Sequence, residues 1–169
     1  MYIVGSKVVH PCHGAGTIVR IQQKSIGATE HTYYIIHTVG KPMQVMVPVR
    51  SADQLGLRDV GEQGDLRTKL AACRERPAAD EINSDFRARQ LALNEQLKSG
   101  RFELVTCAVR TLHFLNAQRP LGMMDRQLLD AGKQILASEL ALASDLDIEA
   151  AMAEIDTSLA RMFDGPECD

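Results

Sequence analysis

The spacing of apolar residues along the chain changes once, near residue 61. Before that point, short β-branched runs alternate with polar or turn-forming residues, a period of two that is typical of half-buried strands. The runs lie at residues 8–9, 18–21, 31–39 and 43–49. With Gly27-Ala28 as one connection, the pattern predicts four or five short strands that form a small, strongly bent β-barrel.

Beyond residue 61, apolar residues recur every three or four positions, which predicts α-helices. Five helices are expected, over residues 66–74, 84–97, 101–118 and 124–143 and from Asp147 onward. Ser84 or Asp85 can cap the second helix, and Gly100 can end it in a left-handed conformation. The predicted fold class is α+β, with a β-barrel over 1–60 followed by an all-α bundle over 61–165.

A corner rich in proline and glycine follows the first strand. Pro11 has no N–H for a strand ladder and restricts His10 to extended backbone, so the strand should end there. Gly14 and Gly16 allow a tight turn or a bulge before the β-branched run from Thr17 resumes the sheet. The pattern therefore predicts two strands joined by a sharp corner.

The net charge of −3 is unevenly distributed along the chain. Residues 1–60 hold six Lys or Arg against three Asp or Glu, and residues 61–135 hold twelve against ten. Residues 136–169 hold one, Arg161, against nine. Acidic surface repels a phosphate backbone, so contact with nucleic acid has to come from the first 135 residues.

No apolar run is long enough to span a bilayer and no secretion signal is visible, so we expect a cytoplasmic protein without a membrane partner. The four cysteines show no paired spacing and are predicted to be free thiols. They are Cys12, Cys73, Cys107 and Cys168. His10, Cys12 and His13 are too few ligands for zinc, so no metal site is expected.

Known catalytic signatures are also missing from the sequence. It shows no nucleophile elbow, phosphate-binding loop or paired carboxylates, and we therefore expect no enzyme, cofactor or small-molecule substrate.

Spaced identities at the first corner point to a known family. The pattern Gly-x-x-Val-Val-x-Pro-x-His-Gly-x-Gly-x-Ile resembles the N-terminal signature of the CarD/CdnL family of bacterial transcription regulators. It is matched by Gly5, Val8, Val9, Pro11, His13, Gly14, Gly16 and Ile18. The likeness continues at 51–58, where Gly56 and Arg58 recur, at 97–100 and at 134–143.

The resemblance implies two modules with separate partners. The first would be a Tudor-like β-domain that binds RNA polymerase and is also found in the transcription-repair coupling factor. The second would be a helical domain that binds promoter DNA beside the polymerase.

Two residues correspond to family contacts with the polymerase β subunit. Lys24 stands at a basic position, and Met46 stands where relatives carry Arg. An exposed Met can still pack at an interface. The alternative for Lys24 is an ordinary surface lysine.

Phe86 stands where the family has a Trp that wedges into the minor groove at the upstream edge of the transcription bubble. An apolar wedge can hold a partly unstacked base step open. The alternative is a Phe packed in the bundle, as Phe commonly is.

Cations near Phe86 would contact phosphates, although a solvated surface is the alternative. The cations of the helical half are Arg87, Arg89, Lys98, Arg101, Arg110, Arg119, Arg126 and Lys133. Four of them, Arg87, Arg89, Arg110 and Arg126, are predicted to bind DNA. The family carries more cations where this chain has Ala88 and Leu91, and often Arg where it has Phe114 and Leu115. DNA binding should therefore be weaker than in typical members.

These inferences predict a non-catalytic regulator that binds RNA polymerase and upstream promoter DNA and modulates open-complex stability. Through the polymerase it would be associated with the nucleoid. The alternative is a polymerase-binding adaptor that has lost direct DNA contact, as Ala88 and Leu91 suggest. An enzyme is a distant third, because a site can be built on any fold.

Overall fold

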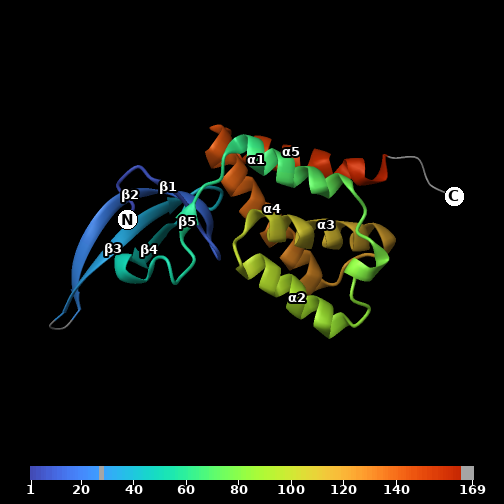
Figure 1. Ribbon diagram of the computed structural model, residues 1–169, viewed down its shortest axis with the longest axis horizontal. Coiled ribbons are helices and arrows are strands. Elements are labelled where there is room, and N and C mark those ends of the chain that lie inside the picture. Colours follow the sequence, from blue (N-terminus) through green and yellow to red (C-terminus); the bar gives the residue numbers. More distant parts are fainter. Residues whose placement is uncertain (27–28, 165–169) are drawn as a thin grey trace.

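The computed structural model describes residues 1–26 and 29–164. The predicted connection at Gly27-Ala28, Cys168 and the end of the predicted helical domain lie outside these residues. A sheet unit lies beside a helical unit (Figure 1), which confirms the α+β class. The strands are β1 (Lys7–His10), β2 (Gly14–Ile26), β3 (Thr29–Thr38), β4 (Gln44–Pro48) and β5 (Arg58–Asp59).

The sheet is antiparallel and open, in the order β4-β3-β2-β1-β5. Its edges are β4 and β5, which are not neighbours, so the predicted closed barrel is not confirmed. A register shift between Ile18 and Arg20 bends β2, since a bulge adds a residue to one strand only. Because β4 pairs only with Tyr33–His37, the far part of the β2–β3 hairpin projects beyond the sheet (Figure 1).

Within the described residues the helical unit contains five α-helices, as predicted, although the first begins earlier than 66 and gives way to a 3-10 turn after Leu70. They are α1 (Gln63–Leu70), α2 (Phe86–Lys98), α3 (Phe102–Gln118), α4 (Met123–Ser144) and α5 (Ile148–Ala160). The Asp85 carboxylate accepts the backbone N–H groups of Arg87 and Ala88, which confirms the predicted cap of α2. Gly100 follows α2 with φ of 64°, as predicted for a left-handed stop.

Short 3-10 turns also occur in the described residues, at Val49–Ser51, Ala71–Arg74, Ala79–Glu81 and Arg161–Phe163. Within the described ranges, no helix is long and apolar enough to cross a membrane.

Two separate hydrophobic clusters form beneath these elements. The first lies on one face of the sheet and is covered by the segment that follows β4; its buried members are Val8, Ile18, Tyr34, Ile36, Val47, Ala52 and Leu57. The second joins the helices and centres on α3 and α4, with Val105, Val109, Leu112, Leu136 and Leu140 fully buried. The boundary between 60 and 61 as a division into domains stays a prediction.

Helices α2 and α4 run parallel to each other. Gln90 Nε2 donates to Asp125 Oδ1 at 3.0 Å, and seven residues further along each helix, Leu97 packs against Gly132. A Cβ on Gly132 would lie 3.0 Å from Leu97 Cδ2, so glycine allows this close approach. The two helices therefore begin at the same end of the bundle, away from the sheet (Figure 1).

Candidate partner-binding surfaces

One face of the sheet carries both residues predicted to bind the polymerase. Lys24 pairs with His31 across β2 and β3, and Met46 pairs with Ile35 across β3 and β4. Side chains alternate along a strand, so residues 31, 33 and 35 and their cross-strand partners share a face. Lys24 Nζ lies 3.8 Å from Met46 Sδ, and both side chains are exposed. The structure therefore brings these two residues together.

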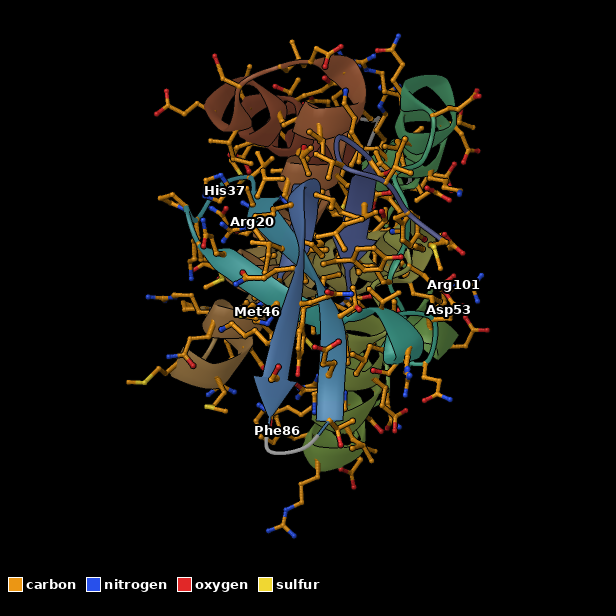
Figure 2. The ribbon with its side chains drawn as sticks, turned by 90° about the vertical axis from the view of Figure 1, so that its left-hand side faces the viewer. Arg20, His37, Met46, Asp53, Phe86 and Arg101 are labelled. Atoms are coloured by element: carbon orange, nitrogen blue, oxygen red, sulfur yellow. The ribbon has the colours of Figure 1, made fainter. Side chains whose placement is uncertain are left out.

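We call this surface the Lys24 face. By strand register it also includes Arg20, Gln22, His31, Tyr33, His37 and Gln44. Figure 2 shows Arg20, His37 and Met46 on one side of the sheet, and Asp53 on the other. Arg20 and Lys24 carry positive charge, whereas none of the described residues on this face is acidic. The Lys24 face is therefore electrostatically suited to an acidic protein surface.

Phe86 is the first residue of α2, and its side chain is exposed at 53%. The alternative of a Phe packed in the bundle is therefore not what the structure shows. The guanidinium of Arg89 lies over the Phe86 ring, with Cζ 5.6 Å from the centroid. Arg89 is held in turn by its Nη1, which donates to the Asn83 carbonyl at 2.9 Å. One side of the ring is thus covered by a cation–π contact, which orients the aromatic ring at the surface.

The predicted phosphate-binding arginines fall into two groups. Arg87 and Arg126 are exposed, near the starts of the parallel helices α2 and α4, and Arg89 stacks on Phe86. Arg110 differs, because its side chain is largely buried and forms a salt bridge with Glu81. The structure therefore stacks Arg89 on Phe86 and leaves Arg87 and Arg126 exposed near the starts of α2 and α4, whereas Arg110 is paired with Glu81.

The other end of α2 is attached to the sheet unit. Arg58 Nε and Nη2 both donate to the Gly100 carbonyl, at 3.2 and 2.6 Å. At 1.5 Å per residue, the 13 residues of α2 extend about 20 Å from this attachment to Phe86. Helix α2 therefore connects the sheet unit to the exposed ring at its far end.

Arg58 also forms the main ion pair between the two units. Its Nη1 and Nη2 lie 2.7 Å from the two carboxylate oxygens of Glu139, which is fully buried on α4. Glu139 Oε1 also accepts the Gly61 N–H at 3.1 Å. Burial lowers the pKa of Arg58, but the hydrogen bond and charge of Glu139 outweigh it and raise that pKa overall. The buried carboxylate is thus fully paired, as a buried charge requires.

The corner after β1 rests on the helices. The Ala15 N–H donates to Ser138 Oγ at 2.9 Å, and a Cβ on Gly14 would lie 2.5 Å from the same oxygen. A Cβ on Gly100 would lie 2.6 Å from the Pro11 Cα. Only glycine permits these approaches, so Gly14 and Gly100 set how closely the units pack.

The corner shows no metal-binding arrangement. The Cys12 N–H donates to His10 Nδ1 at 3.2 Å, and the His10 and His13 rings are 4.7 Å apart. Burial, followed by the charge of His13, lowers the pKa of His10. Across residues 1–26 and 29–164, no group of three or more His, Cys, Asp or Glu is arranged to hold a metal ion.

Models of known protein families match both the sheet unit and the helical unit. A family model described as the CarD-like/TRCF RID domain matches residues 2–61, and one described as the CarD C-terminal domain matches residues 73–156. The chain belongs to the CarD-like family. "Putative transcription factor YdeB" of Bacillus subtilis (strain 168) is 25% identical over 140 residues, which cover 83% of this chain and 90% of the relative.

The stretches that resemble the CarD-like family meet at the junction between the units. Pro11 and Gly14 come from the first corner, Arg58 from the stretch after β4, Gly100 from the end of α2 and Ser138 from α4. These positions lie far apart in the sequence. Their contacts indicate that several of the matching residues of this CarD-like chain act in packing the two units together.

Sequence reasoning missed two features near Phe86. It did not identify the stacking of Arg89, which depends on a rotamer, or the exposure of Met123 and Met124 at the start of α4. A signal for the second was present: two consecutive apolar residues precede the helical stripe, and neighbours in sequence cannot both face one core.

Proposed function

We propose that this CarD-like protein is a non-catalytic transcription regulator. In this proposal the Lys24 face binds the β subunit of RNA polymerase, and the start of α2 contacts promoter DNA at the upstream edge of the bubble. Membership of the CarD-like family supports the polymerase partner, because RID denotes an RNA-polymerase-interacting domain. The relative named as a transcription factor supports the same role.

The main support for the proposed DNA contact is the exposed position of the Phe86 ring. Its ring is exposed at the start of a capped helix, with Arg89 on one side and Arg87 beside it. An aromatic ring flanked by cations suits insertion beside a base step, where the ring stacks and the cations meet phosphates. Arg110 is left out of this proposed contact because Glu81 already pairs with it.

The proposed action requires no chemical step. Binding energy from Phe86 is gained only when the upstream base step is unstacked, so the protein favours the melted promoter through its higher affinity for that state. The junction around Arg58 holds the sheet unit and α2 together while both partners are bound. We further propose that the protein acts in the cytoplasm at the nucleoid and that its sheet unit is of the Tudor-like type.

A second candidate is a polymerase-binding adaptor without DNA contact. It is favoured by the outer face of α2, where Ala88 and Leu91 are exposed in place of cations. Salt dependence separates the two functions, because each phosphate contact makes binding more sensitive to salt. The adaptor predicts that promoter-bound and promoter-free polymerase bind the protein with the same salt dependence.

The test of the proposed function is Phe86→Ala. Loss of stacking should cost about 1–3 kcal/mol, which shortens the open-complex lifetime by about five- to 150-fold. The melting temperature should barely change, because the ring is mostly exposed. Phe86→Trp should preserve or lengthen the lifetime. Leu55→Ala, at an exposed apolar site on the segment after β4 in the sheet unit, is the control and should leave the lifetime unchanged.

Two results would contradict this function. An unchanged lifetime with Phe86→Ala would remove the wedge and favour the adaptor. A lowered melting temperature with a normal lifetime per folded molecule would make Phe86 a packing residue.

A further inference from the structure

Two methionines form an exposed apolar pair at the start of α4. Met123 is exposed at 77% and Met124 at 60%. Both precede Asp125, which accepts the hydrogen bond from Gln90 one turn into α2. Because α2 and α4 are parallel and in register at this contact, the methionines lie at the same end of the bundle as Phe86. Three large apolar side chains are therefore exposed at one end of the protein.

The charges at this end favour an anionic partner. Arg87, Arg119 and Arg126 are exposed, and within the part of the chain that the structure describes none of them forms a salt bridge. Nearby carboxylates are already engaged: Asp85 caps α2, and Asp125 is buried against Gln90. Exposed cations therefore accompany the apolar side chains at this end, where Asp85 and Asp125 are engaged within the protein.

We propose that Met123 and Met124 form a second apolar contact to promoter DNA, beside Phe86. This inference rests on the proposed function and extends its DNA contact from α2 to the start of α4. DNA is favoured over a protein partner because the exposed arginines at this end of the bundle complement a phosphate backbone. Methionine is among the side chains that minor-groove proteins insert between base steps, and its flexible thioether can adapt to an irregular groove.

In this proposal, cations outside α2 replace those that α2 lacks beside Phe86. The start of α4 supplies Arg126, and the loop before it supplies Arg119. Both helices begin at the same end of the bundle, so in this proposal DNA bound at Phe86 also contacts Met123. The contact is therefore shared between two helices.

The experiment compares variants of the full-length protein on a promoter bound by RNA polymerase. The double variant Met123→Gln, Met124→Gln keeps the length and helix propensity of the side chains and removes their apolar character. We expect the open-complex lifetime to fall about tenfold, in line with partial burial of two Met side chains. Leu55→Gln, at an exposed apolar site on the segment after β4 in the sheet unit, should leave it unchanged. Melting temperatures should stay equal in all three proteins.

A photo-cross-linking amino acid at position 123 identifies the occupant directly. Cross-linking to labelled promoter DNA supports the inference. Cross-linking only to a polymerase subunit, or to a second copy of this chain, overturns it and assigns these methionines to a protein interface.

The Phe86→Ala variant, measured in parallel, separates the two proposals. If Phe86→Ala shortens the lifetime and the methionine variant does not, the second contact is overturned and the proposed function stands. If neither variant changes the lifetime, both are overturned.

Discussion

Arg58 of β5 and Glu139 of α4 form a two-pronged salt bridge across the junction of the sheet and the helices, with both N–O distances at 2.7 Å. The same guanidinium donates to the Gly100 carbonyl at the end of α2. One side chain thus connects a strand, a buried carboxylate and the helix that carries Phe86. Together with the Ala15–Ser138 and Gly100–Pro11 contacts, this ion pair holds the two proposed binding surfaces in their relative placement.

Loss of the carboxylate should destabilise the protein. Glu139→Ala leaves Arg58 partly buried without its partner and removes the acceptor for the Gly61 N–H, so we expect a loss of about 2–4 kcal/mol in the free energy of unfolding. Urea denaturation measures it. Asp145→Asn removes a second salt bridge between the units, the exposed pair with Lys7, and should cost less than about 1 kcal/mol.

Equal effects of these two substitutions would contradict the importance assigned to Glu139. Such a result would mean that burial of the Arg58 pair contributes no more than an exposed pair.

A methyl group at Gly100 should be poorly tolerated. Gly100 has φ of 64°, and its added Cβ would lie 2.6 Å from the Pro11 backbone, which cannot move as a flexible side chain could. Gly100→Ala should therefore lower the free energy of unfolding by about 2 kcal/mol or more. Gly64→Ala is the control: nothing lies within 4 Å of its Cβ, and a helical Ala should stabilise by about 0.5 kcal/mol. Thermal or urea unfolding of both variants decides the point, and a neutral Gly100→Ala would contradict the close approach.

His113 should make stability depend on pH. Burial and then Lys133 lower its pKa, while Asp156 has an opposite effect. The folded protein therefore favours the neutral ring, so this contribution is complete above the unfolded pKa of about 6.5 and is lost as the pH falls toward the folded pKa. Lys133→Gln should move the pKa of His113 upward and reduce this loss, as measured by NMR titration of the ring. Lys98→Gln, at an exposed site on α2, should not move it; a downward shift with Lys133→Gln would contradict the assigned cause.

The Lys24 face should govern binding to the polymerase β subunit. Lys24→Glu reverses a charge on a surface without acidic neighbours and should weaken binding at least about tenfold at low salt, with a smaller effect at high salt. Met46→Arg places a second cation within reach of the same region and should strengthen binding. Lys98→Glu makes the same change of net charge on the helical unit. Biosensor titration with the β subunit tests all three, and equal loss with Lys24→Glu and Lys98→Glu would show that only net charge matters.

Local signals in the sequence determined the elements of this protein. Asp85 can accept the free N–H groups at the start of α2, and Gly100 can adopt the left-handed conformation that ends it, so both boundaries were predictable from neighbouring residues. The change of hydrophobic period near residue 61 separated strands from helices for the same reason. Such features depend on interactions within a few residues of each other.

Only the tertiary structure determined the features that depend on residues far apart in the sequence. The sheet is open because its edge strands β4 and β5 do not pair with each other. Strand β5 has only two residues and forms by pairing with β1. Phe86 is exposed although it lies on the same side of α2 as the buried Leu93 and Leu97, so the bundle covers only the later part of that side. Arg58 and Glu139 are 81 residues apart, and their pairing follows from the packing of two units, which no local pattern encodes.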